Sequence, residues 1–415
     1  MKRFIYNIMI LCAATLFMAS GCDKDSKSGA ELMIMSASPM QFSHAAKNAS
    51  LKFVASGHWS ISADADWITV APTSGDSDGK ETVTVKVAVA ANDSKAREGE
   101  VVVKAGTKEV KVRVEQESGE PVRVRLLYWN IQYGMWADQG SNYDNFVAWI
   151  KEINPDICVW NEAKSAYYTG TTTRFTSPSE FYLPGNWPAL AKRYGHNFVA
   201  SSPHTDSFNF PQVVTTRNYE IQTVNNFRGS TKDTLITRYG AQQKVMIDSK
   251  ALNIITLHLW PNSSDRLTGE ESIKAGAEYR KKELTYIFKR SILKDKDAAE
   301  NLWMCLGDFN SRSSEDQWHY KYTGDNLYQY IPLDYLRSET PFKNVMTAMH
   351  PGEHHSTTYG DATIDYVFVT PRLLEGVKSA SIVKTGFPGN IKKDPVTGMQ
   401  IPSDHRPIVV DFEIL

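Results

Sequence analysis

The sequence of 415 residues contains little cysteine and no excess of charge of either sign. Of its 4 cysteines, Cys158 and Cys305 are the two that follow residue 22. Two cysteines cannot build a disulfide framework or a structural zinc site. Both stand in apolar, strand-like stretches, so we interpret them as small core residues, with a pairing between them as the less favoured alternative. The 46 basic and 47 acidic side chains give no basic surplus that would favour a nucleic-acid partner, although a local basic groove stays open.

One extended apolar run opens the chain, from Phe4 to Met18, after two basic residues. It is shorter than the ~20 residues of a membrane-spanning helix, so we favour an export signal over a transmembrane anchor. The following Ala19-Ser20-Gly21-Cys22 resembles the end of a bacterial lipoprotein signal, although Ala stands where such signals usually carry Leu. The resemblance implies a lipoprotein-type signal peptide over residues 1–22, a lipidated Cys22 and a solvated tether over residues 23–30. We therefore expect an extracytoplasmic, membrane-anchored protein that faces the periplasm or the cell surface.

Residues 31–117 show the alternation of half-buried strands. Apolar side chains occupy every second position in Val83–Val89 and in Val110–Val114, and a period of two is typical of strands that bury one face. Turn-forming residues, such as those at positions 73–76, separate these stretches. The pattern predicts a small all-β sandwich of immunoglobulin-like size.

This stretch resembles the BACON module found at the front of secreted bacterial proteins. The matching positions are Trp59, Trp67, Pro72, Gly75, Asn92, Arg97, Gly99 and Gln116. The resemblance implies either a glycan-binding module or a spacer. Indole rings can stack on sugars, but we favour core packing for Trp59 and Trp67, and we predict no binding residue in this module.

A polar linker with Gly and Pro is expected at residues 118–121, and the pattern changes after it. From residue 122 to residue 415, apolar strands alternate with helical stretches. One helix is predicted from about residue 276 to 293, where Tyr279, Leu284 and Ile287 recur at helical spacing. This alternation is typical of an α/β domain.

Polar side chains stand at the ends of the apolar strands in this second region. They are Asn130, Glu162, His258, Asp308 with Asn310, Asp365, and Asp404 with His405. A carboxylate or a titratable ring beside a buried strand is costly to desolvate unless a cation or a hydrogen-bond donor meets it. Taken singly, each residue also has an ordinary structural explanation, as a turn former or a surface residue.

Two of these positions carry a geometric expectation. Alternation places Asp308 and Asn310 on one face if the strand continues past the Gly307 that precedes them. Asp365 stands inside an apolar run, so its carboxylate needs a partner such as a histidine.

In this order the six strand ends resemble the endonuclease/exonuclease/phosphatase superfamily, the deoxyribonuclease I-like fold, over residues 122–415. The resemblance implies an α/β fold with four layers, in which two packed mixed sheets form a sandwich with helices outside. It implies a metal-dependent phosphoric ester hydrolase that uses Mg²⁺, or else Mn²⁺ or Ca²⁺. The expected substrate is a phosphodiester or phosphomonoester in a nucleic acid, a phospholipid headgroup or a sugar phosphate. We expect a monomer.

The resemblance also implies residue roles. Glu162 would be the main metal ligand, with Asn130 and Asp404 completing or bordering the site, and a two-metal variant stays open. His405 would act as the general base or, as a cation, would hold the phosphate. Asp365 would bond to the other ring nitrogen and fix the tautomer.

Some family members give the water-activating role to the aspartate that matches Asp308. Asn310 would orient the nucleophile or a phosphate oxygen, and His258 would protonate the leaving group or bind transition-state charge. Asn130 is also included in the catalytic set. The abasic-site repair branch carries tyrosine at the position of His258 and an acidic residue at that of Gln132, which disfavours this branch.

Two other classes of function remain as alternatives. One is a binding lipoprotein whose catalytic site has decayed, which the retained polar strand ends disfavour. The other is a glycan-adhesion protein driven by residues 31–117. The adjacent His354 and His355 are expected to be solvated.

Overall fold

The computed structural model describes residues 32–164, 187–203, 210–229, 235–248, 250–261, 269–321, 324–387 and 401–414. The predicted signal peptide, the tether and the lipidated Cys22 lie outside these residues. Internal contacts divide the chain into two compact units, with the boundary between Glu120 and Pro121. Within the described part, no helix combines the length and the apolarity that crossing a membrane requires.

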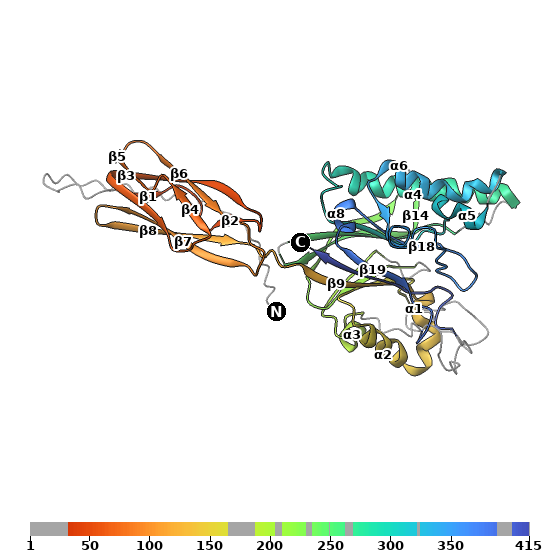
Figure 1. Cartoon of the computed structure of the whole chain (residues 1–415). Coiled ribbons are helices and arrows are strands. Elements are labelled where there is room, and N and C mark those ends of the chain that lie inside the picture. Colours follow the sequence, from red (N-terminus) through yellow and green to blue (C-terminus); the bar gives the residue numbers. More distant parts are fainter. Residues whose placement is uncertain are drawn as a thin grey trace, which may run out of the picture. The chain divides into compact units, whose positions relative to one another are not determined.

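The N-terminal unit is built from strands (Figure 1). They are β1 (Leu32–Ile34), β2 (Met40–Phe42), β3 (Lys47–Ala63), β4 (Ile68–Ala71), β5 (Ser74–Asp78), β6 (Val83–Val89), β7 (Arg97–Ala105) and β8 (Lys108–Gln116). The long β3 pairs antiparallel with β6 through its first half and with β7 through its second half, which links the strands in the order β2-β8-β7-β3-β6-β4. Alternate side chains of these strands fill one core. The predicted all-β unit is confirmed.

Trp59 belongs to this core. Its side chain is buried and packs edge-on against Phe53, with 5.3 Å between ring centroids. A Cβ atom at Gly75 would lie 2.7 Å from the indole, so glycine leaves the room that the ring fills. Trp67 is half-buried beneath the guanidinium of Arg97, 4.5 Å from the ring centroid. Core packing therefore accounts for Trp59, as the sequence predicted.

The C-terminal unit contains two six-stranded sheets. The first has the order β11-β12-β10-β9-β20-β19 and comprises β9 (Val122–Asn130), β10 (Ile157–Asn161), β11 (Phe198–Ser201), β12 (Val213–Thr216), β19 (Val377–Ile382) and β20 (Ile408–Ile414). The second has the order β13-β14-β15-β16-β18-β17 and comprises β13 (Ile221–Gly229), β14 (Leu235–Ile247), β15 (Lys250–His258), β16 (Trp303–Asp308), β17 (Lys343–Asn344) and β18 (Asp365–Val369).

Helices cover the outer faces of both sheets (Figure 1). The α-helices are α1 (Gln132–Met135), α2 (Asp144–Ile153), α3 (Trp187–Arg193), α4 (Gly269–Arg290), α5 (Gln317–Tyr320), α6 (Ile331–Glu339), α7 (Val345–Met349) and α8 (Pro371–Leu374). Short 3₁₀ turns are η1 (Trp136–Ser141), η3 (Ile292–Lys294), η4 (Ser314–Asp316) and η5 (Gly324–Tyr330). Helix α4 begins at Gly269, earlier than the predicted residue 276. The prediction missed the first turns because they are mostly polar and show no apolar residues at helical spacing.

Three apolar clusters hold the layers together. One lies between the two sheets, where Leu126 and Val410 of the first sheet belong to the same cluster as Leu306 of the second. The second cluster packs α2 against the first sheet and includes Cys158, and the third packs α4 and α6 against the second sheet and includes Cys305. Both cysteines are buried and unpaired, as predicted. The predicted four-layered α/β sandwich is confirmed.

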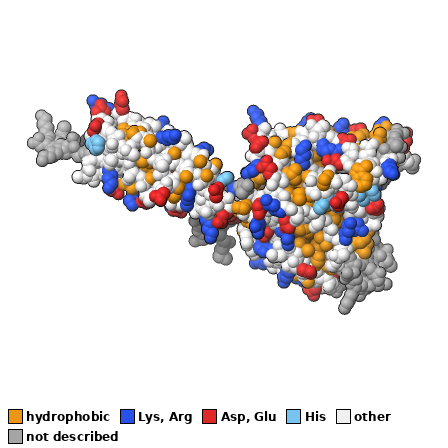
Figure 2. Space-filling view, viewed as in Figure 1, with side chains coloured by type: hydrophobic (Ala, Val, Ile, Leu, Met, Phe, Trp, Pro, Cys, Tyr) orange, Lys and Arg blue, Asp and Glu red, His pale blue; other side chains and the backbone are white. Residues whose placement is uncertain are grey.

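Charges of both signs are interspersed on the visible face of this unit (Figure 2). This distribution agrees with the balanced composition of 46 basic and 47 acidic side chains. The face drawn shows no single-sign stripe that would attract a polyanion over a long range.

Candidate active site

Strand pairing brings the predicted polar residues to one end of the two sheets. In the first sheet, β9 and β10 run parallel, and Asn130 is paired in register with Asn161, the neighbour of Glu162. In the second sheet, Asp308 of β16 pairs with His258 of the parallel β15 and with Asp365 of the antiparallel β18. Parallel strands end at the same edge of a sheet, so the side chains after them share one space.

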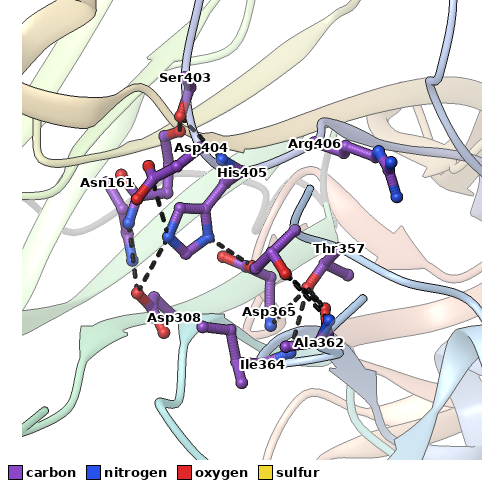
Figure 3. A network of polar contacts seen from close by, with 12 residues as sticks. Asn161, Asp308, Thr357, Ala362, Ile364, Asp365, Ser403, Asp404, His405 and Arg406 are labelled. Carbon is purple, nitrogen blue, oxygen red and sulfur yellow. Dashed lines mark hydrogen bonds and ion pairs between the residues drawn. The ribbon is translucent and has the colours of Figure 1, made fainter. Parts of the chain in front are cut away.

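His405 lies between carboxylates (Figure 3). Its Nδ1 is 2.7 Å from Oδ2 of Asp365, and its Nε2 is 3.8 Å from carboxylate oxygens of both Asp308 and Asp404. The other carboxylate oxygen of Asp365 accepts a hydrogen bond of 2.7 Å from the hydroxyl of Tyr128. The buried Asp365 therefore has the histidine partner that the sequence predicted for it.

The surroundings of His405 favour its charged form. Burial alone would lower the pKa of the ring, but the Asp365 carboxylate, with Asp308 and Asp404 beyond it, raises the pKa well above its usual value. Its backbone carbonyl accepts a hydrogen bond of 2.9 Å from the indole of Trp129. The Asp365 carboxylate thus orients the His405 ring through Nδ1 and favours its protonated form.

Asp308 is the carboxylate on which the site converges. Its Oδ2 lies 3.2 Å from the amide nitrogen of Asn130 and 3.3 Å from Nε2 of His258, while its Oδ1 accepts the N–H of Asn310 at 2.9 Å. Burial would raise its pKa, but His258, His405 and the donated hydrogen bonds together lower it below its usual value. Asp308 is therefore an ionised carboxylate in a buried position.

Asn310 departs from the geometric expectation. Strand β16 ends at Asp308, and Asn310 has a left-handed backbone with φ of 47°, so the two residues do not continue one strand face. The side-chain amide of Asn310 instead donates to the carbonyl of Leu259 at 3.1 Å. The residue still lies beside Asp308, because its backbone N–H binds the carboxylate.

His258 is buried, with its ring 5.6 Å from that of Phe210. Burial and the charge of Arg238 lower the pKa of His258 to about 4, against the opposing effect of Asp308. Among the described residues, its Nδ1 has no hydrogen-bond partner. The structure thus holds a neutral imidazole beside Asp308.

Glu162 has a left-handed backbone with φ of 55°, which turns its side chain out of the line of β10. One carboxylate oxygen accepts the N–H of Tyr133 at 3.0 Å, and the other lies 3.4 Å from the amide of Asn130. Burial raises the pKa of Glu162, Arg238 lowers it, and the charge of Asp404 raises it further. Glu162 and Asp404 are close enough for each to oppose the ionisation of the other. A divalent cation between them would stabilise both ionised carboxylates.

These residues fit a hard divalent ion such as Mg²⁺. Glu162 and Asp404 offer carboxylate oxygens, and the Asp404 side chain is 58% exposed and open to solvent or to an ion. Asn130 is arranged as a bridge, since its Nδ2 faces Glu162 and Asp308 while its Oδ1 accepts the N–H of Gln132 at 3.1 Å. Its predicted role as a metal ligand stays a prediction. Ligating atoms of Asp308, Asp365 and His405 also lie within 4.8 Å of one another.

Three contributors were missed by the sequence predictions. Tyr128 precedes Asn130 by two positions, so alternation along β9 places it on the same face and could have identified it. The Ser403 hydroxyl donates to the carbonyl of Asn130 at 2.7 Å and accepts the N–H of His405 at 3.1 Å, which fixes the turn that carries the histidine. Arg238 of β14 donates to the Leu259 carbonyl at 3.0 Å. Nothing in its local sequence points to the site.

The architecture and this cluster define an α/β sandwich built around a polar site at the strand ends. A model of the Endonuclease/Exonuclease/phosphatase family matches residues 127–405, and the chain belongs to this family. Members of the family are metal-dependent phosphoester hydrolases. A second model, described as the BACON putative binding domain, matches residues 57–117. The resemblances to the BACON module and to the endonuclease/exonuclease/phosphatase superfamily are confirmed, and the lipoprotein signal stays a prediction.

Solved structures similar to the chain come from several organisms. An AP endonuclease from Archaeoglobus fulgidus is 15% identical with a TM-score of 0.44, covering 70% of this chain and 100% of that one. The human Nocturnin catalytic domain with bound sulfate is 16% identical with a TM-score of 0.45, covering 70% and 93%. A family protein from Leptotrichia buccalis is 16% identical with a TM-score of 0.43, covering 70% and 100%. A search of curated proteins gave no match.

Proposed function

We propose that the chain is a divalent-metal-dependent phosphoesterase. The observation that carries the proposal is the buried, ionised Asp308, which contacts the neutral His258 and faces the charged His405. A cluster with this much buried charge is expensive to maintain in a protein that only binds a ligand. Its retention therefore favours catalysis over the binding-lipoprotein alternative.

Glu162 and Asp404 would hold the ion, with Asn130 beside them. The bound ion supplies positive charge to the oxygens of the phosphoester. Asp308 accepts a hydrogen bond from the attacking water and orients it, because its lowered pKa keeps the carboxylate ionised. His405 carries its proton and binds a phosphate oxygen through Nε2, since Nδ1 is held by Asp365.

His258 orients Asp308 from a neutral ring through its Nε2, 3.3 Å from the carboxylate. The negative charge of a bound phosphoester would raise the pKa of this histidine, so that Nδ1 would take up a proton from solvent and give it to the leaving oxygen. The proton that the attacking water loses would pass to Asp308 and from there to solvent. The backbone N–H of Asn310 holds the side-chain carboxylate of Asp308 in place. The side-chain amide of Asn310 gives one N–H to the Leu259 carbonyl and has a second N–H for a phosphate oxygen. These roles need no group beyond this chain, the ion, the water and the substrate.

The test is hydrolysis of bis-p-nitrophenyl phosphate by the purified full chain in Mg²⁺, extended to plasmid DNA, sphingomyelin and inositol or sugar phosphates. We expect hydrolysis that a chelator abolishes and that His405→Ala reduces by about 10²-fold or more. The substrate in this set that is cleaved fastest identifies the phosphoester class. Failure to cleave any of them would favour the binding-protein alternative.

The proposed cellular location is the extracytoplasmic side of a membrane, with Cys22 as the lipid anchor. The support is the order of basic residues, apolar run and small residues before Cys22. Cells that express the full precursor in the presence of labelled palmitate should label the protein and retain it in the membrane fraction. Cys22→Ser should abolish the label, and equal labelling of both proteins would contradict the anchor.

For the BACON-like unit we propose a spacer role. Trp59 is buried in the core and Trp67 is half-covered by Arg97, so neither indole offers an open face for stacking on a sugar. The full chain is therefore expected to show no binding to mucin or to a glycan array. Binding that Trp67→Ala removes would restore the glycan-adhesion alternative.

A further inference from the structure

A second group of metal-type ligands lies between α7 and β18. His350 follows α7, and a turn in which the N–H of Glu353 donates to the His350 carbonyl at 3.2 Å brings Glu353 and His355 back toward it. One nitrogen of each ring and one carboxylate oxygen of Glu353 lie within 4.8 Å of one another. None of these three residues belongs to the phosphoester site.

His350 is oriented as a ligand. Its Nε2 lies 2.8 Å from the carbonyl of Ala380 in β19. A carbonyl only accepts, so Nε2 carries the proton and Nδ1 keeps its lone pair. Metal-binding histidines in proteins are commonly held in this way, with the second ring nitrogen donating to a carbonyl or a carboxylate.

A ring nitrogen of His355 faces the Glu353 carboxylate without making a hydrogen bond among the described residues. Its Nε2 is buried and has no hydrogen bond within the described part of the chain, and it stands 3.7 Å from a carboxylate oxygen of Glu353. The side chains of His354 and His355 are 12% and 17% exposed, so the expectation that both are solvated was wrong. Burial, followed by the neighbouring His350, lowers the pKa of His355 and favours the neutral ring that binds metals.

The orientation of the two rings also suits a shared ion. The ring centroids of His350 and His355 are 5.0 Å apart, and the ring planes are inclined by 55°, so their lone pairs can converge. Zinc ligands about 2.0 to 2.2 Å from the metal stand roughly 3.4 Å apart in a tetrahedral site. The observed 3.7 Å between His355 and Glu353 needs only a small contraction.

The neighbouring cluster of His319, His354 and Asp361 has a geometry that does not suit a shared metal ion. His319 and His354 stack face to face, with 3.6 Å between centroids and an angle of 8°, so their lone pairs run parallel. An ion bonded to both rings would lie outside both ring planes. Asp361 instead lies within 3.2 Å of Nε2 of His354 and within 3.4 Å of Nε2 of His319, which accounts for the cluster by internal contacts.

We propose that His350, Glu353 and His355 bind a transition-metal ion of the zinc type, through Nδ1, a carboxylate oxygen and Nε2. Two imidazoles and one carboxylate favour Zn²⁺ or Co²⁺ over Mg²⁺, which prefers oxygen ligands. Three protein ligands leave a fourth position for water. The Lys384 ammonium is near enough to influence His355 and opposes the charge of the ion.

The experiment is a Co²⁺ titration of the metal-stripped full chain in excess Mg²⁺, followed by visible absorption. Four-coordinate Co²⁺ with nitrogen ligands absorbs strongly, whereas an octahedral oxygen site absorbs weakly. We expect one equivalent of strongly absorbing Co²⁺ that Zn²⁺ displaces. His355→Gln and Glu353→Gln should each weaken binding at least tenfold, and Lys384→Met should strengthen it.

His354→Gln is the matched control, because it changes the adjacent residue and belongs to the stacked cluster. It should leave the Co²⁺ titration unchanged. Thermal unfolding of each variant without metal should match that of the wild type, which separates lost binding from lost folding. An unchanged titration in His355→Gln, or loss of binding in His354→Gln with binding retained in His355→Gln, would overturn the assignment.

Discussion

Two sides of the active site place a histidine near the same carboxylate, but one ring is neutral and the other is positively charged. Nε2 of His258 is 3.3 Å from Asp308 and Nε2 of His405 is 3.8 Å from it. The His405 side adds Asp365, 2.7 Å from Nδ1, whereas Nδ1 of His258 has no partner among the described residues. Accordingly the pKa of His258 falls to about 4, while that of His405 rises well above its usual value. Burial and the charge of Arg238 keep His258 neutral, whereas the carboxylate of Asp365 outweighs burial at His405.

The largest effect is expected from removing the shared carboxylate. Asp308→Asn keeps the shape of the side chain but removes the charge that both histidines face, so kcat should fall by about 10³-fold. The measurement is hydrolysis of bis-p-nitrophenyl phosphate in Mg²⁺. Asp411→Asn is the control, since Asp411 is paired with Arg125 in β9, and its activity should stay within a few-fold of the wild type. Near-normal activity of Asp308→Asn would contradict the assignment.

A smaller loss is expected when the His405 side is made to resemble the His258 side. Asp365→Asn removes the carboxylate that raises the pKa of His405, so kcat should fall by about 10²-fold. If His405 acts as a cation, the alkaline limb of the profile of kcat/KM against pH should also move to lower pH. An unshifted limb would assign Asp365 an orienting role alone and would reopen the general-base role of His405.

The His258 side can be tested through stability. Its folded pKa of about 4 lies below the value of 6.5 expected in the unfolded chain. The unfolded state therefore binds more protons between these values, and stability falls as pH drops from about 7 to about 5, by ~2 kcal/mol from this residue. Urea unfolding at both pH values should show a smaller difference for His258→Asn than for the wild type.

The same measurement should give the opposite sign for His405. Its folded pKa is raised, so the stability that it contributes is fully present below pH 6.5 and is lost as pH rises through the folded value. His405→Asn should therefore flatten the alkaline side of the stability profile rather than the acid side. Equal slopes for the two variants would remove the contrast between the histidines.

The sequence predicted which residues form the active site more reliably than it predicted their backbone geometry and contacts. The ends of buried strands converge in an α/β fold, so Asp308, Asp365 and His405 could be grouped from position alone. Local backbone geometry was less accessible: the left-handed Asn310 ends the alternation that the sequence suggested. The roles of Arg238 and of the Ala380 carbonyl could not be predicted from the sequence. Each contacts a residue that is distant in the sequence and that only the packing of the fold brings near it.

Tyr128 carries the smallest expected effect and separates orientation from stability on the His405 side. Tyr128→Phe removes the 2.7 Å hydrogen bond to Asp365, which leaves a buried carboxylate oxygen without its donor and destabilises the fold by about 1 to 3 kcal/mol. Asp365 keeps its bond to His405, so kcat should fall only about three- to tenfold.

Tyr194→Phe is the matched control for this last substitution. Tyr194 is also buried, and its hydroxyl contacts Thr215 and the indole of Trp160 rather than the catalytic cluster. Its removal should lower the free energy of unfolding to a similar degree and leave kcat unchanged. If Tyr128→Phe and Tyr194→Phe lose activity equally, the loss in Tyr128→Phe results from lower stability. The different charges of His258 and His405 would then depend on Asp365 without any contribution from Tyr128.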